Sequence, residues 1–212
     1  MRLKKVKGAL ENVQKSKYYV ENPESNIGKW KEVFGNNNPI HIEIGMGKGN
    51  FIIGMAQKNP NINFIGIEMY DSVLVRAVEY LNTSELELNN LKLLLLDANN
   101  IENIFEKEIE EIYLNFSDPW PKARHAKRRL TSPVFLKKYD KIFEAQKYIV
   151  MKTDNTDLFD FSIETLKEHG YDLIEVTRDL HALNDDTNVL TEYEKKFSEK
   201  GIKINRLKAI CE

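Results

Sequence analysis

Several residue types are scarce in this chain, and their scarcity excludes specialised protein classes. One cysteine, Cys211, occurs among 212 residues, so no disulfide can form within the chain, and no Cys/His cluster of a zinc site is present. No apolar run is long enough to cross a bilayer, and the N-terminus MRLKKVKGAL lacks the apolar segment of a signal peptide. We therefore expect a cytoplasmic protein with no membrane segment and no metal.

Charge of neither sign is in large excess. The formal net charge of −2 argues against a uniformly basic surface for nucleic acid, but it is compatible with a local basic patch. Hydrophobic residues make up 42% of the chain, which is enough for the core of one large domain. Any functional site is therefore expected in a local cluster of residues.

Strand and helix patterns alternate after the first 35 residues. Apolar segments expected as strands cover 40–45, 62–68, 91–97, 111–118 and 147–154, and helical spacing follows each of them, at 50–59, 69–81, 100–107, 132–145 and 158–170. Two final alternating segments, 171–179 and 202–210, are expected to form an antiparallel edge. The pattern predicts an α/β fold, a doubly wound, mostly parallel seven-stranded sheet with an antiparallel edge strand. We expect residues 1–35 to form a basic extension with a helix near 27–34, and residues 36–212 to form the domain.

Polar residues gather where the expected strands end, which is where ligands bind in such sheets. The first strand runs into a glycine loop with Glu43, Gly45 and Gly47, and glycines at this spacing let the backbone approach a ligand closely. The later strands end at Glu68, at Asp97 (with Asn99 close behind), at Asp118 and at Asp154. Because a carboxylate in the position of Glu68 can accept hydrogen bonds from both hydroxyls of a ribose, the cluster predicts a nucleoside cofactor.

Two cofactors compete for this cluster, a nicotinamide dinucleotide and S-adenosylmethionine. The dinucleotide fingerprint G-x-G-x-x-G is broken, because Asn50 stands in place of its third glycine. Glu43 would repel a pyrophosphate but attract the sulfonium and amino groups of S-adenosylmethionine, and Asp97 suits an adenine amine. The acidic set favours S-adenosylmethionine, although each carboxylate alone could be a solvated strand end or a helix cap.

The stretch NFSDPWPKARHAKRRL, residues 115–130, joins a carboxylate to a basic run. Asp118 stands next to prolines that fix φ, and the simpler interpretation is a proline turn capped by this aspartate. Five Lys/Arg and one histidine then follow within eight positions. Such a run is usually a solvated face, but this one leaves the sheet beside the expected cofactor, and its density suits the phosphates of a polymer.

Six motifs, spread over residues 43–194, together resemble one family. EIGMGKG, GIE, DANN, FSDPWPKARHAKRRL, KTDN and TEYE are similar to motifs of the bacterial tRNA (guanine-N7-)-methyltransferases, for which DPWPKxRHxKRR and TxYE are highly specific. The resemblance implies a Rossmann-like class I methyltransferase fold. It also implies methyl transfer from S-adenosylmethionine to N7 of the guanine at position 46, in the variable loop of tRNA. tRNA is then the expected partner of a monomer or homodimer.

The resemblance implies roles for individual residues. Asp118 would be the catalytic residue. The cofactor would contact Glu43, Gly45, Gly47, Glu68, Asp97, Asn99 and Asp118. The substrate would contact Lys122, Asp154, Thr191, Glu192, Tyr193 and Glu194, and RNA would contact Arg124, His125, Lys127, Arg128 and Arg129.

The chemistry of guanine N7 limits what Asp118 and the substrate-binding residues would have to do. N7 has a lone pair and no proton to lose, so Asp118 is expected to orient the base and stabilise developing positive charge rather than act as a general base. Glu194, Glu192 and Asp154 are candidate acceptors for the N1–H and amine of guanine, although TEYE is also typical of a helix start capped by Thr191. An exocyclic-amine methyltransferase, a non-catalytic RNA-binding scaffold and a dehydrogenase are the alternatives.

Overall fold

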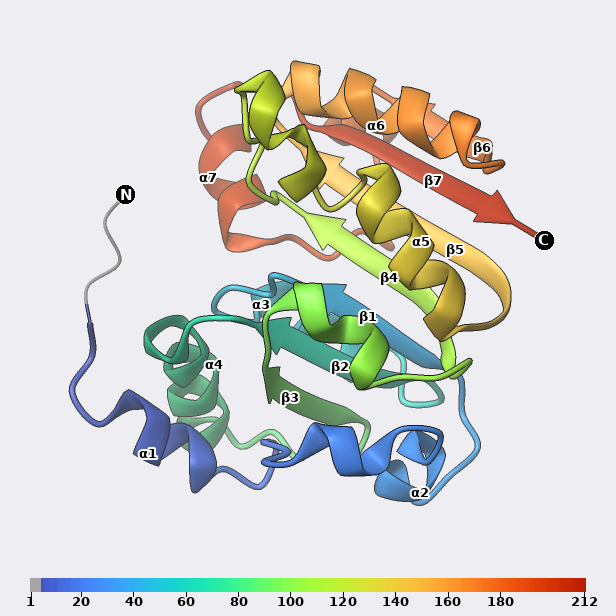
Figure 1. Ribbon diagram of the computed structural model, residues 1–212. Helices are drawn as coiled ribbons and strands as arrows, with labels where there is room; N and C mark the ends of the chain where they lie inside the picture. Colours follow the sequence, from blue (N-terminus) through green and yellow to red (C-terminus); the bar gives the residue numbers. More distant parts are fainter. Residues whose placement is uncertain (1–4) are drawn as a thin grey trace.

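A single seven-stranded sheet forms the centre of the computed structural model, which describes residues 5–212 (Figure 1). The strands are β1 (Ile40–Ile44), β2 (Asn63–Glu68), β3 (Leu91–Leu95), β4 (Ile109–Asn115), β5 (Phe143–Thr153), β6 (Asp172–Thr177) and β7 (Asn205–Cys211). Their order across the sheet is β3-β2-β1-β4-β5-β7-β6. Strands β1 to β5 pair in parallel, whereas β7 pairs antiparallel with both β5 and β6.

The predicted doubly wound, mostly parallel sheet is thereby confirmed. Its edge strand β6 pairs antiparallel with its neighbour, as expected, but the strand that runs against the other six is β7, one place in from the edge. Because β6 ends and β7 begins at the same side of the sheet, the connection between them, residues 178–204, stays on that side. This is also the side at which β1 to β5 end, so the connection is available to help build a ligand site.

Helices cover both faces of the sheet (Figure 1). They are α1 (Ala9–Gln14), α2 (Trp30–Phe34), α3 (Asn50–Lys58), α4 (Asp71–Thr83), α5 (Pro133–Ile142), α6 (Thr156–Glu168) and α7 (Glu192–Ser198), with short 3-10 helices η1 (Pro23–Asn26), η2 (Ala98–Asn103), η3 (Ala123–Arg128) and η4 (Leu180–Leu183). One buried cluster joins α2, α5 and α6 to the sheet, and the other joins α1, α3 and α4 to it. All five residues of β1 are buried, because both of its faces are covered.

The N-terminal segment packs against the rest of the domain. Helix α1 lies against α4 (Figure 1), and Tyr19 forms an isolated parallel bridge with Leu93 of β3. Trp30 of α2 is fully buried, and its Nε1 donates to the carbonyl oxygen of Ile104 at 2.9 Å. Residues 1–4, the beginning of the expected extension, lie outside the described residues.

Three strands end two or three residues earlier than their sequence pattern predicts. We expected β3 to run to Asp97, β4 to Asp118 and β6 to Asp179, but they end at Leu95, Asn115 and Thr177. Beyond β4 the chain turns at Phe116, whose φ of 51° is left-handed, and the prolines that follow cannot donate hydrogen bonds to a neighbouring strand. The expected helix at 100–107 is the 3-10 helix η2 instead. Among residues 5–212, no helix combines the length and the apolar character needed to span a bilayer.

Candidate active site

The glycine loop between β1 and α3 leaves open space at two positions. Gly45 and Gly47 have φ values of 79° and 58°, and a Cβ built on either would meet no atom within 4 Å. The loop is held back by β2, because the amides of Gly45 and Met46 both donate to the carbonyl oxygen of Ile67, at 2.8 and 3.0 Å. The glycine conformations are thus required by the turn, while the space beside them is free for a ligand.

A cavity of about 260 Å³ lies against this loop. Its walls come from four parts of the chain: the stretch from Glu43 through the glycine loop to Phe51 at the start of α3, Val73 of α4, the end of β4 with Asn115 and Phe116, and the start of α7. Residues 191–193 and Lys196 form the α7 wall. The connection between β6 and β7 therefore contributes directly to the cavity.

Glu43 is the buried carboxylate of the cavity and is 2% exposed. Its Oε1 accepts a hydrogen bond from Nδ2 of Asn115 at 2.9 Å, whereas its Oε2 has no hydrogen-bond partner among the described residues. Burial raises the pKa of Glu43 to about 7, and the bond from Asn115 and the charge of Lys152 oppose the increase. An unpartnered buried carboxylate oxygen beside a cavity is a site for a cationic or hydrogen-bond-donating ligand.

Glu68 ends β2, as expected, and its carboxylate binds backbone amides. Oε2 accepts from Gly47 N at 3.1 Å, and Oε1 accepts from Met69 N and Tyr70 N at 2.8 and 3.1 Å. Burial raises the pKa of Glu68, these amide bonds oppose the increase, and the charge of Asp118 adds a smaller increase. Glu68 and Asp118 therefore lie within electrostatic range of each other at the same side of the sheet.

Asp97 is half-buried and caps the helix η2. Its Oδ1 accepts from both the backbone N and the side-chain Nδ2 of Asn99, each at 2.9 Å. These two predicted cofactor residues are thus bonded to each other just beyond the end of β3.

Asp118 is exposed, and an arginine clamps the loop that carries it. Arg129 donates from Nε to the carbonyl oxygen of Pro119 at 3.0 Å and from Nη2 to that of Trp120 at 3.2 Å. Its guanidinium also lies 4.3 Å from the ring centroid of Phe161. Trp120 has a left-handed φ of 42°, a conformation that an aromatic residue keeps only when its surroundings enforce it.

The basic run forms the 3-10 helix η3 and its flanks. Lys122, Arg124, Lys127 and Arg128 are exposed, and Arg128 lies 4.8 Å over the ring of Trp120. His125 is half-buried and meets the same ring edge-on at 5.7 Å. Arg129 differs from the rest of the predicted RNA-binding set, because its Nε and Nη2 donate to the loop.

The TEYE motif begins α7, and its two glutamates point in different directions. Thr191 and Glu194 form a capping box, with Glu194 N donating to Thr191 Oγ1 at 2.9 Å. Glu194 is 0% exposed and pairs with Nζ of Lys152 at 3.0 Å, whereas Glu192 is exposed and pairs with Lys48 of the glycine loop at 2.7 Å. The predicted helix start is therefore present, and the candidate guanine acceptor Glu194 faces the protein interior.

Two other members of the predicted substrate set lie nearer to solvent. Tyr193 is 52% exposed, and its ring stacks near that of Phe116 with centroids 6.2 Å apart. Asp154 is half-buried and directly follows β5. Tyr193 lines the cavity, whereas Asp154 is not among its lining residues.

The sequence did not predict eight residues that line the cavity, namely Met46, Lys48, Asn50, Phe51, Val73, Asn115, Phe116 and Lys196, nor Lys152, which contacts the cavity wall from β5. Asn115 and Phe116 begin the NFSDPWP stretch, but nothing in their residue types indicated a contact with Glu43 or Tyr193. The position of Lys152 could have been used for a prediction, because a lysine within an apolar strand that is buried indicates a buried ion pair.

Comparison with known proteins identifies the family. A family model described as "Putative methyltransferase" matches residues 37–207. The tRNA (guanine-N(7)-)-methyltransferase of Lachnoclostridium phytofermentans is 54% identical over 214 residues, covering 100% of this chain and 99% of that protein. The protein of the same name from Listeria innocua is 55% identical over 192 residues, covering 90% of this chain and 89% of its own.

Solved structures support the fold. The 16S rRNA methyltransferase KamB superposes with a TM-score of 0.66 at 10% identity, covering 86% of this chain and 92% of its own. An antibiotic-related methyltransferase superposes with a TM-score of 0.65 at 16% identity, covering 87% and 92%. At such low identity these structures show a shared architecture alone. Identity above 50% along nearly the whole sequence is a stronger relationship, and by it this chain belongs to the tRNA (guanine-N(7)-)-methyltransferase family, built on a class I methyltransferase fold.

Proposed function

We propose that this protein transfers a methyl group from S-adenosylmethionine to N7 of a guanine in tRNA, at position 46 of the variable loop. The observation that carries the proposal is the cavity itself. It lies between an acidic glycine loop and the TEYE helix, and the relatives that share this sequence at 49–55% identity carry the name of that activity. The basic helix η3 follows Asp118 within a few residues, so phosphates can be bound close to the chemistry.

S-adenosylmethionine fits the groups that line the cavity. The unpartnered Oε2 of Glu43 suits a cationic donor, and the open space at Gly45 and Gly47 suits a ligand pressed against the backbone. Glu68 would hold the ribose hydroxyls, while Asp97 and Asn99 would lie toward the adenine. When bound, S-adenosylmethionine supplies an electrophilic methyl group on a positively charged sulfur.

The protein's own part in the chemistry is to orient the guanine and to stabilise positive charge. N7 of guanine carries no proton, so no side chain has to act as an obligatory base. Asp118 is the catalytic residue of the proposal, because its carboxylate can stabilise the charge that moves onto the base. The Arg129 clamp holds the Asp118 loop in place without an adjustment during the reaction.

Guanine recognition is assigned to the members of the predicted substrate set other than Glu194. Asp154 and Glu192 can accept hydrogen bonds from N1–H and the exocyclic amine, and a carboxylate in that position would disfavour the N1 lone pair of adenine. Tyr193 offers a ring for stacking, and Lys122 and Thr191 would complete the contacts. Glu194 is less suited to this task, because both of its oxygens already have partners inside the protein.

RNA binding is assigned to Arg124, His125, Lys127 and Arg128. The target guanine takes part in the tertiary structure of folded tRNA, so it has to be displaced into the cavity at a cost of a few kcal/mol. Contacts between the basic run and phosphates would offset that cost, and they would make binding strongly dependent on salt.

One experiment tests the whole proposal. The protein is incubated with methyl-labelled S-adenosylmethionine and unmodified tRNA, and the product is cleaved chemically at N7-methylguanosine. We expect label in tRNA and a single scission in the variable loop. Label on an exocyclic amine would favour the alternative methyltransferase, and scission outside the variable loop would rule out position 46.

A further inference from the structure

Two cations face each other across neighbouring strands beside the cavity. Lys152 of β5 and Arg206 of β7 are direct partners in the antiparallel ladder, and their side chains are only 3% and 12% exposed. Like charges opposite each other in a sheet are destabilising, and burial strengthens the effect. This pair of positions therefore requires acidic partners from outside the two strands.

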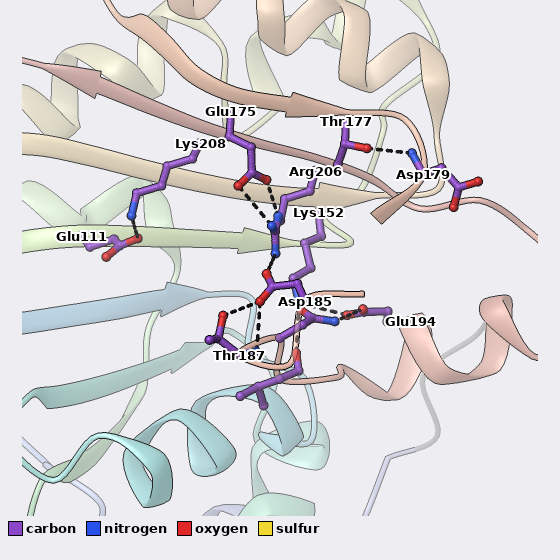
Figure 2. Close-up of polar contacts among 12 residues, drawn as sticks. Glu111, Lys152, Glu175, Thr177, Asp179, Asp185, Thr187, Glu194, Arg206 and Lys208 are labelled. Atoms are coloured by element: carbon purple, nitrogen blue, oxygen red, sulfur yellow. Dashed lines mark hydrogen bonds and ion pairs between the residues drawn. The ribbon is translucent and has the colours of Figure 1, made fainter. Parts of the chain in front are cut away.

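The connection between β6 and β7 supplies those partners, together with Glu175 of β6 (Figure 2). Asp185 accepts from Nη1 of Arg206 at 2.6 Å, and Glu175 of β6 binds the other side of the same guanidinium. Lys152 donates from Nζ to Asn188 Oδ1, to the carbonyl oxygen of Val189 and to Glu194 Oε2, at 2.5, 3.0 and 3.0 Å. All three ammonium hydrogens of Lys152 are thus used to hold residues 188–194.

Glu194 also has all of its polar partners inside the protein. Besides Lys152, its carboxylate accepts from Nδ2 of Asn188 at 2.6 Å, and Nε2 of His181 lies 3.4 Å away. Because Glu194 is 0% exposed, a guanine could reach it only if this network were broken. A buried charge left without its partner would then be strongly destabilising.

The network sets the position of one wall of the cavity. Thr191, Glu192 and Tyr193 line the cavity and lie between Val189 and Glu194, the two points that Lys152 holds. On its other side Nζ of Lys152 lies 5.1 Å over the ring of Phe51, which also lines the cavity. Lys152 therefore connects the α3 wall and the α7 wall.

We propose that Lys152 and Glu194 are positioning residues, a buried ion pair that locks the start of α7 against β5 and so sets the cavity wall that meets the substrate. Glu194 acts inward and does not contact the guanine. That this wall meets the substrate rests on the proposed function, whereas the ion-pair lock concerns only how residues 185–198 are held.

The test uses the single variants Lys152→Met and Glu194→Met, the double variant that combines them, and Glu194→Gln. Lys147→Met is the matched control. Lys147 is on the same strand as Lys152, but it pairs with Asp140 and not with residues 188–194. Hydrogen exchange of residues 185–198 is measured without tRNA, and kcat/KM is measured with tRNA.

We expect each single Met variant to lose exchange protection in residues 185–198 by about tenfold or more, and kcat/KM by about 100-fold. The double variant regains most of both, because no buried charge is left unpaired, and Lys147→Met changes neither. Should a single variant fail to fold, Glu194→Gln decides. It keeps an acceptor for Lys152, so we expect a smaller loss of activity that is accompanied by faster exchange.

Two results would overturn the lock. One is a double variant with restored exchange protection that is as inactive as Glu194→Met, since Glu194 would then act on the substrate directly. The other is unchanged exchange in the single variants or in Glu194→Gln. If the unaltered protein did not methylate tRNA, the proposed function would fail, but the exchange measurements would still decide the lock.

Discussion

Arg129 donates from its Nε to the carbonyl oxygen of Pro119 at 3.0 Å, and this contact ties the end of the basic run to the loop that carries Asp118. Its neighbour Arg128 is exposed and stacks on Trp120 instead. Two adjacent arginines of one motif thus have different surroundings, and we expect Arg129 to position the loop and Arg128 to bind RNA.

The first prediction compares these neighbours. Arg129→Ala should lower kcat on tRNA by about 10- to 100-fold, because the Asp118 loop loses two hydrogen bonds and small displacements at a reacting centre are costly. Arg128→Ala should weaken tRNA binding and reduce the slope of log K against log[salt] by about 1. Steady-state kinetics and binding titrations at several salt concentrations measure both. Identical effects of the two substitutions would contradict the distinction.

The second prediction concerns Glu43 and pH. Its folded-state pKa is raised from 4.5 to about 7, so the folded protein holds the proton more tightly than the unfolded chain does. The stabilising contribution is fully present below pH 4.5 and is lost as the pH rises to about 7. At pH 8 the free energy of unfolding of Glu43→Gln, measured by denaturant titration, should therefore exceed that of the unaltered protein by up to about 3 kcal/mol, with little difference at pH 4.5.

The same carboxylate should couple cofactor binding to pH. The ionised form of Glu43 favours a cationic ligand, so affinity for S-adenosylmethionine should rise between pH 6 and pH 8. Calorimetry in two buffers of different ionisation enthalpy would detect the proton released on binding. Glu43→Gln should bind more weakly and without this pH dependence; an equal dependence in that variant would assign it to another group.

The third prediction tests the role of Asp118. Asp118→Asn should reduce kcat by about 10- to 1,000-fold while the affinity for S-adenosylmethionine changes by less than about threefold, because the carboxylate acts mainly on charge that develops during transfer. Asp157→Asn, an exposed aspartate in the first turn of α6, is the control and should change neither value. Nearly full turnover by Asp118→Asn would remove Asp118 from the catalytic role.

The fourth prediction addresses the N-terminal segment. Trp30→Phe removes the bond from Nε1 to Ile104 O and leaves space in the core, so the free energy of unfolding should fall by about 1–3 kcal/mol. Tyr80→Phe, at a side chain that is 52% exposed, should change it by less than about 0.5 kcal/mol. Denaturant unfolding measures both. Equal stability of the two variants would mean that the segment does not contribute to the domain's core.

The sequence was sufficient to predict the sheet and the positions of Glu43 and Glu68, because hydrophobic period and glycine spacing are local properties. Glu43 and Glu68 lie where the strand pattern placed them. The pattern could not show that β4 stops at Asn115, because that end is set by the left-handed φ of Phe116 rather than by residue type. It also could not separate Arg128 from Arg129, or Glu192 from Glu194. Which side chain turns inward depends on Phe161 for Arg129 and on Lys152 for Glu194, partners that are distant in sequence.

The central claim is that the acceptor atom is N7 of the variable-loop guanine. The most direct measurement compares two synthetic tRNAs that differ only at position 46, one with guanosine and the other with 7-deazaguanosine, whose ring carries C–H in place of N7. With labelled S-adenosylmethionine, we expect one methyl group per guanosine-containing tRNA and none on the 7-deaza tRNA, while both bind the protein with similar affinity. Equal methylation of the two tRNAs would contradict N7 as the acceptor atom.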